Sequence, residues 1–95
     1  MITFEIKYDL NTEKFSVSGN VNREGLEEIV DTLIRNKIGK GEDSTEANKL
    51  DLYVIKFYVD LSEDIIKVND NCGNKGLRLG ILGQLLSNID TVEFE

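Results

Sequence analysis

The sequence contains no histidine, so neither a Ser-His-Asp triad nor a Cys-His pair can form. The side chain that most often acts as a base near neutral pH is therefore missing. A metal centre built from cysteine and histidine is excluded for the same reason. We expect a protein that is not an enzyme, with no catalytic residue, no bound metal and no cofactor.

Cysteine is almost absent as well, because Cys72 is the only one and cannot form an internal disulfide. No basic N-terminal segment followed by an apolar run and a cleavage site is present, so we expect a cytoplasmic protein. Cys72 precedes a predicted helix, whose dipole favours a thiolate, but no partner base accompanies it. We therefore expect a small, packed loop residue.

Long apolar runs are also missing, since the uninterrupted stretches fall far short of the roughly 20 residues that a membrane-spanning helix needs. Basic residues are scarce relative to acidic ones: 11 lysines and arginines face 18 aspartates and glutamates, which gives a formal charge of −7. A phosphate backbone would be repelled by this balance, whereas a basic protein surface would be attracted. We expect a protein partner and no direct contact with nucleic acid.

The residues that are present describe one small domain over 1–95, with 40% apolar residues. Apolar and polar residues alternate strictly from Ile2 to Leu10, and again around Phe15 and Val17, which predicts an antiparallel hairpin. An amphipathic helix follows, with Asn22 as its N-cap and its end near Lys37. Its apolar positions are Leu26, Ile29, Val30, Leu33 and Ile34.

The pattern then repeats after a polar, exposed linker over 39–49. A shift of 51 positions aligns 2–38 with 53–89 without a gap. Turns and helix starts coincide along with the identical residues, which indicates an internal repeat. The identical pairs are Asp9 and Asp60, Leu10 and Leu61, Val17 and Val68, Asn20 and Asn71, Gly25 and Gly76, Leu26 and Leu77, and Ile38 and Ile89.

The predicted organisation is a first repeat over 2–38, a second repeat over 50–89 and an extension over 90–95 that includes a short final strand. The expected fold class is α+β: a two-layer sandwich of duplicated ββα units, in which both helices cover one face of a four-stranded antiparallel sheet.

The second repeat departs from the first on its third strand, where Leu52, Val54 and Tyr58 place apolar side chains on the face away from the predicted core. Ile65 falls on the same face. Such a set indicates a dimer interface or a partner site. The alternative is a central strand that neighbouring segments partly cover.

The second helix carries glycines at positions 76, 80 and 83, and its leucines and isoleucines form two rows. Each glycine inside a helix costs roughly 1 kcal/mol relative to alanine, so a packing reason is expected. We predict a helix buried on two sides, with Gly80 and Gly83 against the first helix or a second copy of the chain.

Acidic residues gather on the outer face of the first helix and in the linker that follows it. They are Glu24, Glu27, Glu28, Asp31, Glu42, Asp43 and Glu46. Carboxylates at helical spacing imitate the spacing of phosphates, so these residues are the predicted partner-binding set. The alternative is a face that only makes the protein more soluble.

The chain favours asparagine, isoleucine, lysine and glutamate, has neither proline nor tryptophan, and contains Leu-Gly-Ile-Leu-Gly at 79–83. In these respects it resembles small proteins of phages and mobile elements from bacteria with AT-rich genomes. Those proteins include inhibitors of host defence nucleases, of the anti-CRISPR and anti-restriction kinds. The resemblance implies an inhibitor that blocks a basic nucleic-acid-binding surface; the alternative is a structural protein that self-associates through an apolar sheet face.

Overall fold

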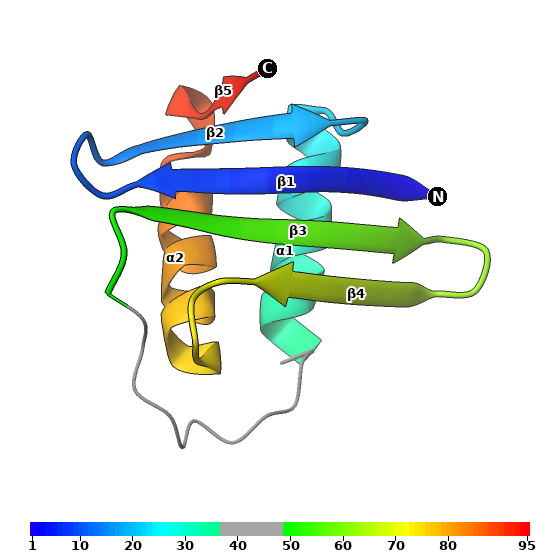
Figure 1. The fold of residues 1–95 in the computed structure, drawn as a ribbon. Coiled ribbons are helices and arrows are strands. Elements are labelled where there is room, and N and C mark those ends of the chain that lie inside the picture. The colour runs from blue at the N-terminus through cyan, green and yellow to red at the C-terminus, as the bar shows by residue number, and fades with distance from the viewer. Residues whose placement is uncertain (37–48) are drawn as a thin grey trace.

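A computed structural model describes residues 1–36 and 49–95 of the chain. Two helices cover one face of a sheet and leave the other face open, which confirms the α+β class (Figure 1). The elements are β1 (Ile2–Asp9), β2 (Lys14–Gly19), α1 (Arg23–Asn36), β3 (Leu52–Asp60), β4 (Ile65–Asp70), α2 (Lys75–Ser87), the 3-10 helix η1 (Ile89–Thr91) and β5 (Glu93–Phe94).

The sheet has five strands in the order β4-β3-β1-β2-β5 and is mixed, whereas the sequence predicted four antiparallel strands. The first four strands pair antiparallel as predicted, and β5 pairs parallel with β2. After α2, η1 returns the chain to the β2 edge, where Val92 is buried and the Glu95 N–H donates to the Val17 carbonyl at 2.8 Å. This anchoring explains why the extension joins the sheet.

Alternate side chains of the strands face the helices and form the core. Phe4 and Ile55 both lie in it, as the predicted repeat requires, and the Phe4 and Phe57 rings stack with centroids 4.7 Å apart. The sheet contributes Phe4, Ile6, Tyr8, Phe15, Val17, Tyr53, Ile55, Phe57 and Val59. The helices contribute Leu26, Ile29, Val30, Leu33, Ile81, Leu82 and Leu85.

The register of the two central strands is symmetric. Ile2 pairs with Val59 at one end and Tyr8 pairs with Tyr53 at the other, and a shift of 51 positions exchanges these two pairs. The pair that the shift maps onto itself is Glu5 and Lys56. An approximate two-fold axis therefore passes between these two residues.

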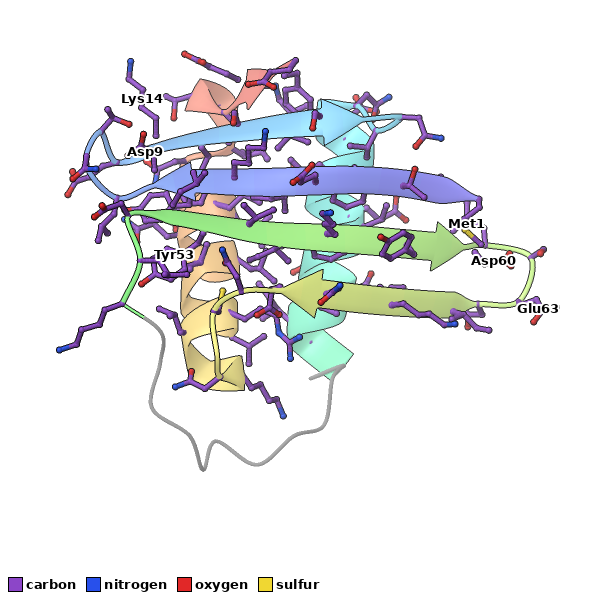
Figure 2. All side chains as sticks on the ribbon, viewed as in Figure 1. Met1, Asp9, Lys14, Tyr53, Asp60 and Glu63 are labelled. Carbon is purple, nitrogen blue, oxygen red and sulfur yellow. The ribbon has the colours of Figure 1, made fainter. Side chains whose placement is uncertain are left out.

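The hairpin turns repeat in the same way. Asp9 accepts from the Asn11 N–H at 2.9 Å, and Asp60 accepts from the Ser62 N–H at 3.1 Å. Positive φ angles of 56° and 54° follow at Glu13 and Asp64. Figure 2 shows Asp9 and Asp60 at opposite ends of the sheet, as a two-fold arrangement requires.

Asparagine side chains extend the sheet after each hairpin. Asn20 Oδ1 accepts from the Thr3 N–H at 2.8 Å, and Asn71 Oδ1 accepts from the Val54 N–H at 2.9 Å. The Nδ2 of Asn71 also donates to Leu52 O at 3.3 Å. In each unit, an asparagine side chain thus accepts the hydrogen bond of a strand N–H group, that of Thr3 in the first unit and that of Val54 in the second.

The helices do not follow the gap-free alignment. Asn22 and Asn74 cap α1 and α2 by accepting from the backbone N–H three residues ahead, at 2.7 Å in each case. These caps lie 52 positions apart because the second unit has one additional residue, Gly73, with φ of 88°. The predicted pairings of Gly25 with Gly76 and Leu26 with Leu77 are therefore wrong by one position.

The glycines of α2 also differ from expectation. The helix buries one broad side, which contains Ile81, Leu82 and Leu85, instead of two separate sides. A Cβ atom at Gly80 or Gly83 would have no neighbouring atom within 4 Å, so no backbone approaches either glycine closely. The predicted contact with the first helix is wrong, and contact with a second copy stays a prediction.

Candidate protein-binding surfaces

Four acidic side chains line the outer side of α1 and form what we call the acidic ridge: Glu24, Glu27, Glu28 and Asp31. Burial of Leu26, Val30 and Leu33 against the sheet turns the opposite side of the helix outward. The three glutamates are exposed, and Asp31 is half-buried. The structure therefore brings these four predicted residues together on one surface.

The basic residues of α1 leave most of this ridge uncompensated. Arg35 pairs with Asp31 one turn away. Arg23 points to the C-terminal segment, where it donates to the carbonyls of Ile89 and Val92 and lies over the Phe94 ring, 5.0 Å from its centroid. Among the residues that the structure describes, none of the three glutamates has an ion-pair partner.

A shallow depression of about 360 Å³ lies between the ridge and α2, where Leu86 is the apolar residue beside the four acids. Sequence reasoning missed Leu86 because its role depends on how the two helices pack. The other predicted acids, Glu42, Asp43 and Glu46, lie outside the described residues.

The predicted interface residues of β3 lie on the open face of the sheet. Leu52 and Tyr58 are 44% and 40% exposed, and Val54 between them is half-buried. Ile65 of β4, 39% exposed, lies on the same face because it pairs with Asp60. The structure thus places these residues on one face of the sheet, away from the core, with Lys56 between Val54 and Tyr58.

The open face also carries one lysine from each of the four long strands: Lys7, Lys14, Lys56 and Lys67. Its acids are Glu5, Asp9, Asp60 and Glu93, the last of which pairs with Ser16 of β2. Charges of both signs are therefore interspersed on the open sheet face, while the ridge on the helical side is acidic throughout. The net charge of the whole chain conceals this difference, although the alternation within each strand contains the signal.

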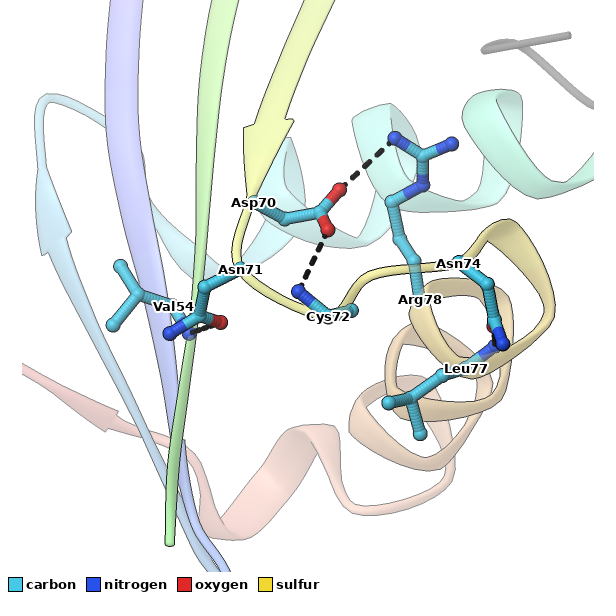
Figure 3. A network of polar contacts seen from close by, with 7 residues as sticks. All are labelled: Val54, Asp70, Asn71, Cys72, Asn74, Leu77 and Arg78. Carbon is cyan, nitrogen blue, oxygen red and sulfur yellow. Dashed lines mark hydrogen bonds and ion pairs between the residues drawn. The ribbon is translucent and has the colours of Figure 1, made fainter. Parts of the chain in front are cut away.

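A network of polar contacts fixes the loop between β4 and α2 (Figure 3). Asp70 accepts from the Cys72 N–H at 2.9 Å and pairs with the Arg78 guanidinium at 3.0 Å. Cys72 is fully buried, which confirms the expected packed loop residue. Burial and the Asp70 carboxylate raise the pKa of the Cys72 thiol to about 12. The thiol is therefore neutral, and the network has a structural role.

Within residues 1–36 and 49–95, no three cysteine, aspartate or glutamate side chains gather closely enough to hold a metal ion. Neither helix in this part of the chain is long and apolar enough to cross a membrane. Comparison with protein families, curated proteins and solved structures finds no match to this chain.

Proposed function

We propose that this protein is a non-enzymatic, cytoplasmic binding module that uses the acidic ridge to engage a basic surface on a larger protein. The observation that carries the proposal is the set of exposed glutamates on α1, at positions 24, 27 and 28, which have no ion-pair partner within residues 1–36 and 49–95. An uncompensated row of charge accelerates association with a basic partner and selects against acidic ones.

In this proposal the protein is a phage-encoded inhibitor that occupies the basic nucleic-acid-binding surface of a host defence enzyme. Support comes from the helical spacing of the ridge carboxylates and from the resemblance in composition described above. The lysines of the open sheet face point away from the ridge, so they do not weaken its field.

The test begins with the partner that the immobilised protein retains from host lysate. We expect replacement of Glu24, Glu27 and Glu28 by lysine to abolish retention, because the contact would become repulsive. The matched control is the triple variant Glu63→Lys, Glu93→Lys and Glu95→Lys, which makes the same change in net charge on other surfaces and should retain the partner. Equal loss in both variants would overturn the proposal.

The second candidate function is a structural protein that self-associates through the open sheet face. It is favoured by the exposure of Leu52, Tyr58 and Ile65 on that face. Sedimentation of the wild type should then show a dimer, and Leu52→Ser with Tyr58→Ser should give a monomer. A monomeric wild type at high concentration would exclude this candidate.

We also infer that the two ββα units arose by duplication of one ancestral unit. The inference is supported by the equivalent turns, by the equivalent side-chain hydrogen bonds of Asn20 and Asn71, and by the symmetric register around Glu5 and Lys56. The additional Gly73 is then a later insertion in the second unit.

A further inference from the structure

A groove of about 380 Å³ lies between α1 and the β3–β4 hairpin. Figure 1 shows this hairpin extending past α1, and Ile66 near its end is only half-buried. The residues that form the apolar floor are Ile2, Gly25, Ile29, Val59 and Ile66. A groove of this size accommodates a large apolar side chain together with part of its backbone.

The other half of the molecule fills the equivalent place with larger residues. The counterparts are Tyr53 for Ile2, Leu77 for Gly25, Tyr8 for Val59 and Phe15 for Ile66. The rings of Tyr8 and Phe15 stack with their centroids 4.5 Å apart, and both side chains are buried. Ile2 and Ile66 are only half-buried. The groove is therefore open because its side chains are smaller than those that fill the equivalent space in the other half of the molecule.

The rim of the groove is acidic. Glu28 borders it from α1, and Asp60 and Asp64 border it from the hairpin turn. No lysine or arginine is among the described residues that line it. Hydrogen bonds from the Ser62 hydroxyl and the backbone N–H groups of Ser62 and Glu63 lower the pKa of Asp60, which favours its charged form.

We propose that this groove receives an apolar side chain of the partner protein, flanked in the partner's sequence by lysine or arginine. The inference rests on the proposed function, because Glu28 belongs to both the acidic ridge and the groove. Basic residues of the partner would contact the rim and the ridge, while the apolar side chain would be buried on the floor. The groove thus adds an apolar anchor to a contact whose ridge supplies charge alone.

Titration of the full chain with the peptide acetyl-Phe-Lys-Arg-amide, followed by NMR, tests the proposal. We expect methyl signals of Ile29, Val59 and Ile66 to shift, while those of Val17 in the core stay in place. Acetyl-Gly-Lys-Arg-amide lacks the anchor and should bind at least about tenfold more weakly, and acetyl-Phe-Glu-Asp-amide should not bind.

Filling the groove should remove peptide binding without unfolding the protein. Ile66→Phe and Gly25→Leu each copy the residue of the other unit, and each should weaken binding of the Phe peptide at least about tenfold. A Cβ atom at Gly25 would lie 3.1 Å from Asn22 Oδ1, so Ile66→Phe keeps the test valid if Gly25→Leu is unstable. An unchanged or raised melting temperature would show that the filled variants are folded.

Neutralising the rim gives an independent readout. Glu28→Gln with Asp64→Asn should weaken binding of the basic peptide, and asparagine suits the φ of 54° at position 64. The control, Glu93→Gln with Glu95→Gln, makes the same charge change away from the groove and should bind normally.

The outcomes separate this inference from the proposed function. If the two basic peptides bind equally and shift only ridge amides such as those of Glu24 and Glu27, the groove inference is overturned and the ridge stands. If neither basic peptide shifts any signal, both are overturned. A dimer that Ile66→Phe disrupts, without any peptide-dependent shift, would assign the groove to a second copy and also overturn the inference.

Discussion

Cys72 lies fully buried within the loop between β4 and α2, and its pKa rises from an ordinary value of 9.0 to about 12. The unfolded chain therefore loses the thiol proton at lower pH than the folded protein. The contribution to stability is complete below about pH 9 and disappears as the pH rises towards 12. We expect the free energy of unfolding in urea to fall over this range, and to fall less steeply in Cys72→Ala.

The same burial predicts that the thiol is protected from chemical attack. A disulfide reagent at pH 8 should leave Cys72 intact in the folded protein and modify it rapidly in urea. Rapid modification without denaturant would show that the loop opens and that the network around Asp70 does not hold it.

Asp70 and Arg78 form the more buried of the two ion pairs in the described part of the chain, with side chains 11% and 13% exposed. Asp70→Ala would remove both the carboxylate that pairs with the Arg78 guanidinium and the acceptor for the Cys72 N–H, so we expect a loss of roughly 3 kcal/mol in the free energy of unfolding. The exposed pair of Asp31 and Arg35 is the control, and Asp31→Ala should cost less than about 1 kcal/mol. Equal losses in urea titrations would contradict the difference in burial.

At the scale of the elements, the side chains of Asn20 and Asn71 each bind the chain after a hairpin to the neighbouring strand. Removal of one neutral hydrogen-bonding side chain costs about 1 kcal/mol. Because the contacts of Asn20 and Asn71 are geometrically equivalent, Asn20→Ala and Asn71→Ala should each lower the free energy of unfolding by about this amount. A large loss at one position and none at the other would contradict the equivalence of the two units.

The glycines at positions 80 and 83 of α2 lead to a prediction opposite to the one that the sequence suggests. A methyl group at Gly80 or Gly83 meets open space and replaces a poor helix former, so alanine at either position should stabilise the protein by about 1 kcal/mol. Thermal unfolding at low concentration measures this gain. A lower melting temperature, or the loss of a dimer, would instead favour the predicted contact with a second copy.

Strict alternation and helical spacing predict the four long strands and both helices, because each of these elements buries a regular set of side chains. The sequence predicts a short final strand within 90–95 but not the edge that it joins, because a strand of two residues has no periodicity that would identify its neighbour. The insertion of Gly73 is missed because the gap-free shift of 51 pairs identical residues at the helix starts, although it also pairs Leu33 with Gln84. Ile81 and Leu85, the counterparts of Ile29 and Leu33 at a shift of 52, are buried like them, which confirms the shifted alignment.

For the whole molecule, sequence spacing predicts the acidic ridge and most of the apolar set on the open face, since the ridge lies within α1 and Leu52, Val54 and Tyr58 lie within β3. The spacing of residues within one element does not predict the groove. The groove depends on the volumes of residues as distant in sequence as Ile2, Gly25 and Ile66, and on how far a hairpin extends past a helix. The separation of lysines from the ridge likewise becomes visible once the faces of the sheet are assigned.

The central claim is that the acidic ridge binds a basic surface, and the salt dependence of binding tests it most directly. The partner retained from lysate is titrated with the protein by calorimetry, between about 50 mM and about 500 mM NaCl. The ridge predicts a dissociation constant that rises steeply with salt, and a much shallower dependence for the Glu24→Lys, Glu27→Lys and Glu28→Lys variant if residual binding remains. A dissociation constant that does not change with salt in the wild type would contradict the claim.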